Sequence, residues 1–317
     1  MIALDFEAPL DELYSKIEEL KRLSGEGQVD LSSEIQTIEK RAEKMKTQVF
    51  SNLTPSQIIQ IARHPNRPDT LSLCQLMFES FIELHGDRQF RDDPSIVAGL
   101  AELDGRRVVV IGHQKGHDTK EKIYRNFGMP HPEGYRKALR FMKMAERFNM
   151  PIVTFVDTPG AYPGKEAEER GQAEAIARNL REMAGITVPI LTFVIGEGGS
   201  GGALGIAVSN KVFMLQYAVY SVISPEGCAS ILFRDANLSD YAAERLKITA
   251  EDIQDLKISD GIVPEPMGGA HNDWPAVADA IKATILTELK GYDKKKSDTI
   301  VEERYQKFRQ FGRFSEK

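Results

Sequence analysis

Cysteine is scarce in this chain: Cys74 and Cys228 are the only two in 317 residues. They lie too far apart in the sequence to form a Cys-x-x-Cys pair, which excludes a zinc ribbon or a redox dithiol built from such pairs. We therefore expect both thiols to be reduced and structural, and we assign no metal site to this chain.

An excess of positive charge and long apolar runs are also missing. The 41 lysines and arginines are outnumbered by 47 aspartates and glutamates, for a formal net charge of -6, so no overall basic field attracts nucleic acid. No apolar run approaches the ~18 residues of a membrane span. The acidic start, residues 1–7, lacks the basic and apolar regions of a secretory signal. We expect a cytoplasmic protein that binds neither membrane nor nucleic acid.

Helical periodicity dominates the first part of the sequence. Apolar residues recur at helix spacing from Leu10 to Leu20 and, after a break at residues 25–27, from Leu31 to Val49. The pattern predicts a helical hairpin whose apolar stripe packs on itself or the core, or docks another subunit. We assign residues 1–75 as an N-terminal helical segment and residues 293–317 as a charged C-terminal helical tail.

Residues 76–292 have the pattern of an α/β core. Asp104-Gly105 between two apolar runs predicts a β-hairpin. Residues 151–164 and 189–202 are near-repeats, each an apolar strand that ends in a glycine-rich loop, with an amphipathic helix at about 166–183 between them. Strands separated by a helix pair in parallel, so both loops are expected at one edge of the sheet, where sites of α/β proteins lie.

The second glycine-rich loop admits three interpretations. Residues 196–201 satisfy the G-x-G-x-x-G pattern of dinucleotide sites, but the next strand, 212–216, ends without the acidic residue that holds ribose hydroxyls. Alternatively, Gly201 and Gly202 at a helix start expose backbone N–H groups that can converge on a developing oxyanion. Close packing of the loop on the helix would also require glycine there. The local sequence leaves the last two open.

A local basic cluster follows the strand that ends near residue 113. It is suited to phosphate groups or to the acidic surface of a partner, and equally to an ordinary solvated face. The cluster consists of Lys115, Lys120, Lys122 and Arg125.

Several long segments resemble the carboxyltransferase alpha subunits of bacterial multi-subunit acetyl-CoA carboxylase, a family within the crotonase superfamily. The similarity covers nearly the whole chain apart from the tail. The matching segments include GHQKG at 112–116, RNFGMP at 125–130, PEGYRKALR at 132–140, DTPGAYPG at 157–164, GEGGSGGA at 196–203 and YSVISPEGCAS at 220–230.

This resemblance implies a fold, a reaction and partners. The fold is a crotonase-like ββα spiral core with an N-terminal helical extension. The reaction moves a carboxyl group from carboxybiotin on the biotin carboxyl carrier protein to acetyl-CoA, and the product, malonyl-CoA, serves fatty acid biosynthesis. The alpha chain pairs with a zinc-ribbon beta subunit in an alpha2-beta2 assembly whose active site lies between the chains. Zinc is expected only in that partner, and biotin carboxylase is a further component.

The resemblance also assigns site residues. The alpha-side oxyanion hole, which steadies the ureido oxygen of biotin, maps onto Gly201 and Gly202. No protein nucleophile is needed, because the nitrogen freed on biotin takes the proton from the acetyl methyl group and the enolate attacks the released CO2. Candidate substrate-binding residues are Gly160, Tyr162, Gly164, Gly198, Gly199, Lys115, Lys120 and Arg125.

Two other functions remain as hypotheses. A stand-alone crotonase-type hydratase or isomerase would need active-site carboxylates near the second loop, where Glu197 is the only one within it. A catalytically passive scaffold would use the helical N-terminus to assemble a complex. We expect Asp157 and Glu226 to hold loops, without a role in proton transfer.

Overall fold

The structure, a computed structural model, describes residues 4–26 and 31–312, and its centre is a mixed β-sheet. Within these residues the sheet has eight strands in the order β1-β2-β3-β4-β5-β6-β8, and β7 also pairs with β5. The first three strands are antiparallel, and every pair from β3 onwards is parallel. The strands are β1 Ser80–Glu83, β2 Ile96–Leu103, β3 Arg106–His113, β4 Ile152–Thr158, β5 Ile190–Gly199, β6 Lys211–Leu215, β7 Val219–Ser221 and β8 Gly261–Val263.

The predicted hairpin between β2 and β3 is confirmed. Leu103 pairs with Arg106, which leaves a two-residue loop. Asp104 and Gly105 both have positive φ, at 48° and 73°. Two consecutive left-handed residues match the twist of a tight antiparallel hairpin, which is why Asp-Gly suits this position.

The parallel pairing of the two near-repeats is also confirmed. Thr154 of β4 lies opposite Thr192 of β5, and their hydroxyl groups are 2.7 Å apart. At the carboxyl ends Thr158 pairs with Gly198, so the two glycine-rich loops leave the sheet at the same edge.

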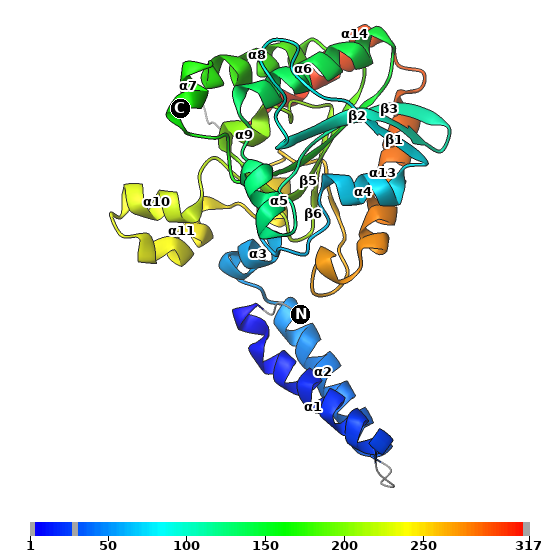
Figure 1. The fold of residues 1–317 in the computed structure, drawn as a ribbon, viewed down its shortest axis with the longest axis vertical. Helices are drawn as coiled ribbons and strands as arrows, with labels where there is room; N and C mark the ends of the chain where they lie inside the picture. The colour runs from blue at the N-terminus through cyan, green and yellow to red at the C-terminus, as the bar shows by residue number, and fades with distance from the viewer. Residues whose placement is uncertain (1–3, 27–30, 313–317) are drawn as a thin grey trace, which may run out of the picture.

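Helices cover both faces of the sheet (Figure 1). On one face α6 packs on β2, β3 and α8, and α14 contacts α8; on the other, α4 and α13 pack together and on β1, β2 and β8. The helices are α1 Ala8–Glu26, α2 Ser32–Phe50, α3 Pro55–Ala62, α4 Thr70–Met77, α5 Thr119–Tyr124, α6 Pro132–Arg147, α7 Lys165–Glu169, α8 Gln172–Ala184, α9 Ser200–Leu204, α10 Pro225–Leu232, α11 Ser239–Leu246, α12 Ala250–Asp255, α13 Trp274–Tyr292 and α14 Ser297–Arg309.

One detail of the predicted helices is wrong. The single helix expected over 166–183 is two helices, α7 and α8, because Gly171 adopts φ 84° and breaks the chain direction between them.

The N-terminal helices α1 and α2 form the predicted hairpin and extend away from the sheet (Figure 1). Leu10 and Ile17 of α1 pack against Ala42 of α2, so the apolar stripe is largely used within the hairpin. At its base, Phe50 packs on Ile61 and thereby joins the hairpin to the rest of the molecule. Residues 27–30, which follow the predicted break, lie outside the described residues.

The predicted tail helix, α14, is docked on the core and is not merely solvated. Arg304 is buried, and its guanidinium donates to the carbonyl oxygens of Met183 and Ile186 at 2.7 Å each and of Val188 at 3.0 Å, and to Asn210 Oδ1 at 2.6 Å. Burial lowers the pKa of this guanidinium to about 10. The final residues, 313–317, lie outside the described part. Among the described helices, none combines the length and apolar character needed to cross a membrane.

We expect Arg304→Met to lower the free energy of unfolding by about 2–4 kcal/mol, because it leaves several buried acceptors without a donor. The matched control is Tyr305→Ala, since Tyr305 is 55% exposed on the same helix. Chemical denaturation of both variants measures the effect. An Arg304→Met midpoint equal to that of the wild type would show that α14 is not anchored through this residue.

Candidate active site

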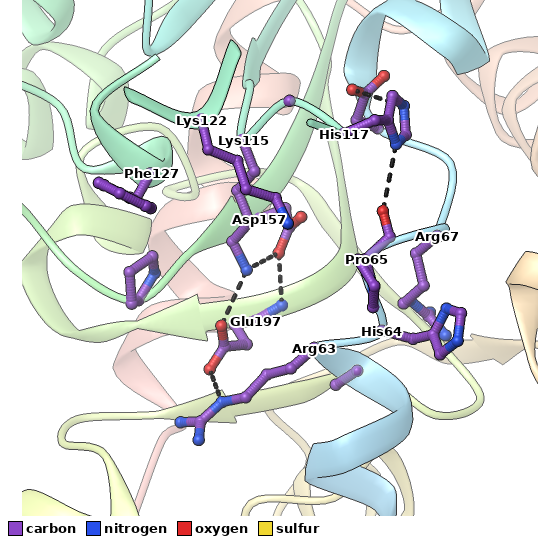
Figure 2. Close-up of a pocket in the computed structure, with 14 residues that line it drawn as sticks. Arg63, His64, Pro65, Arg67, Lys115, His117, Lys122, Phe127, Asp157 and Glu197 are labelled. Carbon is purple, nitrogen blue, oxygen red and sulfur yellow. Dashed lines mark hydrogen bonds and ion pairs between the residues drawn. The ribbon is translucent and has the colours of Figure 1, made fainter. Parts of the chain in front are cut away.

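One lysine ties together the ends of three neighbouring strands. Lys115, just after β3, places Nζ 2.7 Å from Oδ1 of Asp157 in β4 and 2.8 Å from Oε2 of Glu197 in β5 (Figure 2). Asp157 Oδ1 also accepts the backbone N–H of Glu197 at 2.9 Å. The two glycine-rich loops therefore start from ends that are locked to each other.

Arg63, at the end of α3, extends this network. Its Nε lies 2.6 Å from Glu197 Oε1, and its Nη1 lies 2.7 Å from Glu226 at the start of α10. As predicted, Asp157 and Glu226 hold loops in place.

The network also sets the charge state of its members. Burial alone would raise the pKa of Glu197, but Lys115 and Arg63 outweigh it and lower that pKa to about 2. Burial disfavours the charged form of Lys115, but Asp157 and Glu197 outweigh it and raise its pKa. Glu197 is therefore ionised at neutral pH and is a weak base, because its pKa is far from the neutral range in which a hydratase or isomerase would need the one carboxylate of this loop to accept and return a proton.

The glycines of the second loop are present for two different reasons. At Gly202 an added Cβ would lie 2.5 Å from the backbone nitrogen of Ala161, so close packing on the first loop demands glycine. At Gly201 the nearest atom would be 3.7 Å away, on the side chain of Ile176, which is an ordinary contact. Packing therefore requires glycine at position 202, whereas position 201 has room for a Cβ.

Backbone donors lie at the start of α9, directly after β5. Gly201 and Gly202 lie in the first turn, whose N–H groups have no carbonyl acceptor within the helix. Ser200 precedes them with φ 50°, a strained conformation for a residue with a side chain. A short helix start with free N–H groups favours negative charge beside it.

A polar cleft of about 250 Å³ lies beside the network (Figure 2). Its lining is rich in cationic side chains and includes one exposed aromatic ring. These residues are Arg63, Arg67, Lys115, His117, Lys122 and Phe127.

Two further pockets lie next to the cleft along the sheet edge, and the three together are called the groove. A neighbouring small pocket shares Arg63, Pro159 and Glu197 with the cleft and is lined by Gly198 and Gly199. That pocket shares Ser221 and Ile248 with a third, of about 590 Å³. The third pocket is mainly apolar and reaches Ser200, Gly201, Leu204, Tyr220, Val222, Phe308 and Phe311.

His117 forms the outer wall of the cleft. Its Nε2 lies 3.0 Å from Asp69 Oδ2, its Nδ1 lies 3.2 Å from the carbonyl oxygen of Pro65, and its ring stacks on Trp274. The hydrogen bond with Asp69 raises the pKa of His117 to about 9, against the effect of partial burial. The cleft therefore contains an imidazolium at neutral pH.

A family model described as acetyl co-enzyme A carboxylase carboxyltransferase-like matches residues 3–312. The chain belongs to this family. An acetyl-coenzyme A carboxylase carboxyl transferase subunit alpha from Geobacter metallireducens is 58% identical over 99% of this chain and 98% of its own length. One from Syntrophotalea carbinolica is 59% identical over 96% of each chain.

Solved structures show the same fold at low identity. A transcarboxylase 12S structure has a TM-score of 0.60 and 20% identity, covering 76% of this chain and 45% of that one. The beta subunit of a Pseudomonas aeruginosa geranyl-CoA carboxylase has a TM-score of 0.56 and 18% identity, covering 80% and 45%. The crotonase-like core predicted from the sequence is thereby confirmed.

The structure places the predicted glycines at one edge but separates Tyr162 from the groove. Gly160 lies against Gly202, and Gly198 and Gly199 line the small pocket. The Tyr162 ring instead packs on the ring of His131, with 4.6 Å between the ring centroids. At Gly164 an added Cβ would lie 2.3 Å from the Tyr162 ring. Tyr162 and Gly164 therefore pack against each other within the first loop.

The predicted basic residues have separate surroundings. Lys115 is matched to two carboxylates, and Lys120 is exposed and does not line the cleft. Arg125 donates to the carbonyl oxygen of Pro94 at 2.9 Å, which holds a loop. Lys122, absent from the predicted substrate-binding set although part of the basic cluster, does line the cleft.

The segment before residue 75 contributes to the cleft, which the sequence pattern did not indicate. Arg63 and Arg67 belong to the predicted N-terminal helical segment, yet both line the cleft. Arg67 lies between the sheet and residue 265: it donates to the carbonyl oxygen of Ile195 and pairs with Glu265 at 2.7 Å. The dense run of polar residues and prolines at 63–69, between two helices, is the sequence feature that could have indicated a loop at the site.

We expect Gly201→Ala to leave the stability of the protein nearly unchanged, whereas Gly202→Ala should lower it by about 1–3 kcal/mol through backbone overlap. Denaturation midpoints of the two variants provide the comparison. Equal destabilisation at both positions would contradict the difference in space around them. The comparison also shows that activity lost in Gly202→Ala alone cannot be assigned to an oxyanion donor.

We expect the His117–Asp69 pair to stabilise the protein in a defined pH range. Because folding raises the pKa of His117 from 6.5 to about 9, its contribution is complete below about pH 6.5 and is lost as the pH rises through about 9. Partial exposure of the ring reduces the effect to about 1–2 kcal/mol. The measurement is the unfolding free energy against pH for wild type and His117→Gln. Parallel curves would contradict the assignment.

Proposed function

We propose that this chain is the alpha subunit of an acetyl-CoA carboxyltransferase, which transfers the carboxyl group of carboxybiotin to acetyl-CoA and forms malonyl-CoA for fatty acid biosynthesis. Family membership over residues 3–312 supports the reaction. The structural observation that supports a site on this chain is the start of α9, where Gly201 lines an open pocket and Gly202 follows it in the first turn.

The chemistry assigned to this edge is electrostatic. As the N–C bond of carboxybiotin breaks, negative charge moves to the ureido oxygen, and the N–H groups of Gly201 and Gly202 would donate to it. The freed ureido nitrogen then accepts a proton from the acetyl methyl group, and the enolate forms a bond to the released CO2. The ion network around Lys115 keeps the donors in place, so little reorganisation accompanies the charge movement.

A second chain is needed to complete the site in this proposal. The apolar pocket beside Gly201 is open, with Val222 77% exposed and Leu204 38% exposed. Uncovered apolar side chains at a reacting centre suit a partner surface that excludes water. We assign that surface to a beta subunit in an alpha2-beta2 assembly, which would hold the zinc and act in the cytoplasm with the biotin carboxyl carrier protein and biotin carboxylase.

The reverse reaction, carboxyl transfer from malonyl-CoA to free biotin, tests the proposal. We expect turnover only when this chain is mixed with its zinc-ribbon partner, since each chain supplies part of the site. Turnover by this chain alone would contradict the shared site. A verified complex without turnover would instead favour the passive scaffold.

A further inference from the structure

The helix that follows the second glycine-rich loop, α9, is too short to be stable by itself. It spans five residues, Ser200–Leu204, whereas an isolated helix needs about 12–15 residues to be stable in water. The carbonyl oxygen of Gly201 accepts the N–H of Gly205 at 3.0 Å, but the N–H of Ile206 donates to Ala203, three residues back, at 3.2 Å. The regular helical pattern therefore ends after one turn. The conformation of α9 consequently depends on groups from other elements.

A buried asparagine of α8 holds the carbonyl end of this turn. Asn179 is 1% exposed, and its Nδ2 donates to the carbonyl oxygen of Gly205 at 2.9 Å and to that of Tyr135 in α6 at 3.0 Å. Because both acceptors are carbonyl oxygens, only the NH2 group of the amide can face them. One side chain thus joins α6, α8 and the end of α9.

Tyr135 supports the same turn through its ring and its hydroxyl group. Its side chain is buried, and an added Cβ at Gly205 would lie 2.6 Å from its Cε1. The hydroxyl donates to the carbonyl oxygen of Gly202 at 3.3 Å, which is a long hydrogen bond. Burial, and to a lesser degree Asp93, raises the pKa of Tyr135 well above its usual value. The hydroxyl therefore keeps the proton that it donates.

His113 lies behind the turn on the side of the sheet. It is buried at the end of β3, and its ring nitrogens are near the backbone of Gly202 without forming a hydrogen bond to any described residue. Burial lowers the pKa of this imidazole to about 3, although the backbone of Gly202 favours its charged form. At neutral pH the layer of Tyr135, Asn179 and His113 is thus uncharged. It holds the turn without adding a charge that would favour or oppose an anion in front of it.

The hydrogen bonds of Asn179 are not what holds α6 and α8 to the sheet. Phe141 and Met142 of α6 and Met183 of α8 belong to the main hydrophobic core. These apolar contacts keep both helices in place when a single polar contact is lost. The particular effect of Asn179 is therefore on α9.

We propose that Asn179 and Tyr135 are positioning residues for the carboxyl transfer. This inference rests on the proposed function, because it assigns both residues a role in that reaction. In a helical turn the carbonyl groups point along the axis in one direction and the N–H groups in the other. Holding the carbonyl oxygens of Gly202 and Gly205 from behind therefore fixes the direction of the N–H groups at Gly201 and Gly202.

Both residues act through α9 and do not meet a ligand in the groove. Neither Asn179 nor Tyr135 is among the residues that line its three pockets in the described part of the chain. Donors that are already oriented need not move while charge develops on the ureido oxygen. Loss of this orientation should therefore lower the rate of the chemical step and leave substrate binding unchanged.

Kinetics of the reverse reaction test the positioning role. Asn179→Leu keeps the branching and the number of heavy atoms of the side chain. It removes two donors and no other hydrogen bond, since Oδ1 has no partner among the described residues. For the full chain in complex with its zinc-ribbon partner we expect kcat to fall about tenfold, with KM for malonyl-CoA and for biotin unchanged.

Two conservative variants grade the effect. Tyr135→Phe keeps the ring and should lower kcat only about twofold to threefold, because the hydrogen bond that it loses is long. In Asn179→Asp a carboxyl group faces the two carbonyl oxygens, so only its protonated form can donate to them. We expect kcat of Asn179→Asp, relative to wild type, to rise as the pH is lowered, whereas the ratio for Asn179→Leu stays constant.

Backbone hydrogen exchange measures the anchor of α9 independently of turnover. In the same complex we expect peptides that cover residues 196–206 to exchange about fivefold faster in Asn179→Leu than in wild type, while peptides of β4 are unchanged. The control is Arg178→Ala, at an exposed position beside Asn179 in α8, which should alter neither exchange nor kcat.

The possible failures are distinct. Unchanged exchange over residues 196–206 would overturn the anchor, and faster exchange with unchanged kcat, or with a raised KM in its place, would overturn the positioning role. A wild-type complex without turnover would contradict the proposed function and the positioning role with it, whatever the exchange shows. If Asn179→Leu does not fold, Tyr135→Phe decides: unchanged kcat and exchange in that variant would overturn the proposal.

Discussion

The buried ion network of Lys115, Asp157 and Glu197 is the constraint on which the site depends. An unpaired charge in this position would be strongly destabilising, on the order of 3–5 kcal/mol when one partner is removed. The network therefore holds three strand ends in a single arrangement. Since Glu197 begins the glycine-rich loop, the same arrangement determines where the backbone donors of Gly201 and Gly202 lie. The same ion network therefore stabilises the fold and preorganises the backbone donors of the glycine-rich loop.

Glycine serves this site in more than one way. Gly202 allows the backbones of the two loops to touch, while Gly201, one residue earlier, has room for a Cβ and lines the apolar pocket. A run of glycines thus combines a packing requirement with an opening towards the groove. This explains why the packing and oxyanion interpretations, which compete when only the sequence is known, are compatible in the folded chain.

The segment before the core has two physical roles. Helices α1 and α2 pack mainly on each other and extend away from the sheet, whereas α4 contributes Leu73, Cys74 and Met77 to the main core. Between them, the stretch from Arg63 to Asp69 crosses the carboxyl edge of the sheet and adds cations to the cleft. The polar end of the groove is consequently built from parts of the chain more than 100 residues apart, such as Arg63 and Glu197.

By itself, the sequence determined the elements that depend on local pattern: the helical hairpin, the turn at Asp104-Gly105, and the parallel repeats whose glycine-rich loops share an edge. Its long motifs also determined the family. Only the tertiary structure decided which members of the basic cluster are neutralised. The four residues are close together in sequence, but Lys115 pairs with carboxylates of β4 and β5, and Arg125 lies 3.7 Å from Glu121 of α5 and donates to the loop before β2. Lys120 and Lys122 have no ion pair among the described residues. The reason is that ion pairing depends on distances between strands and loops, which local spacing does not encode.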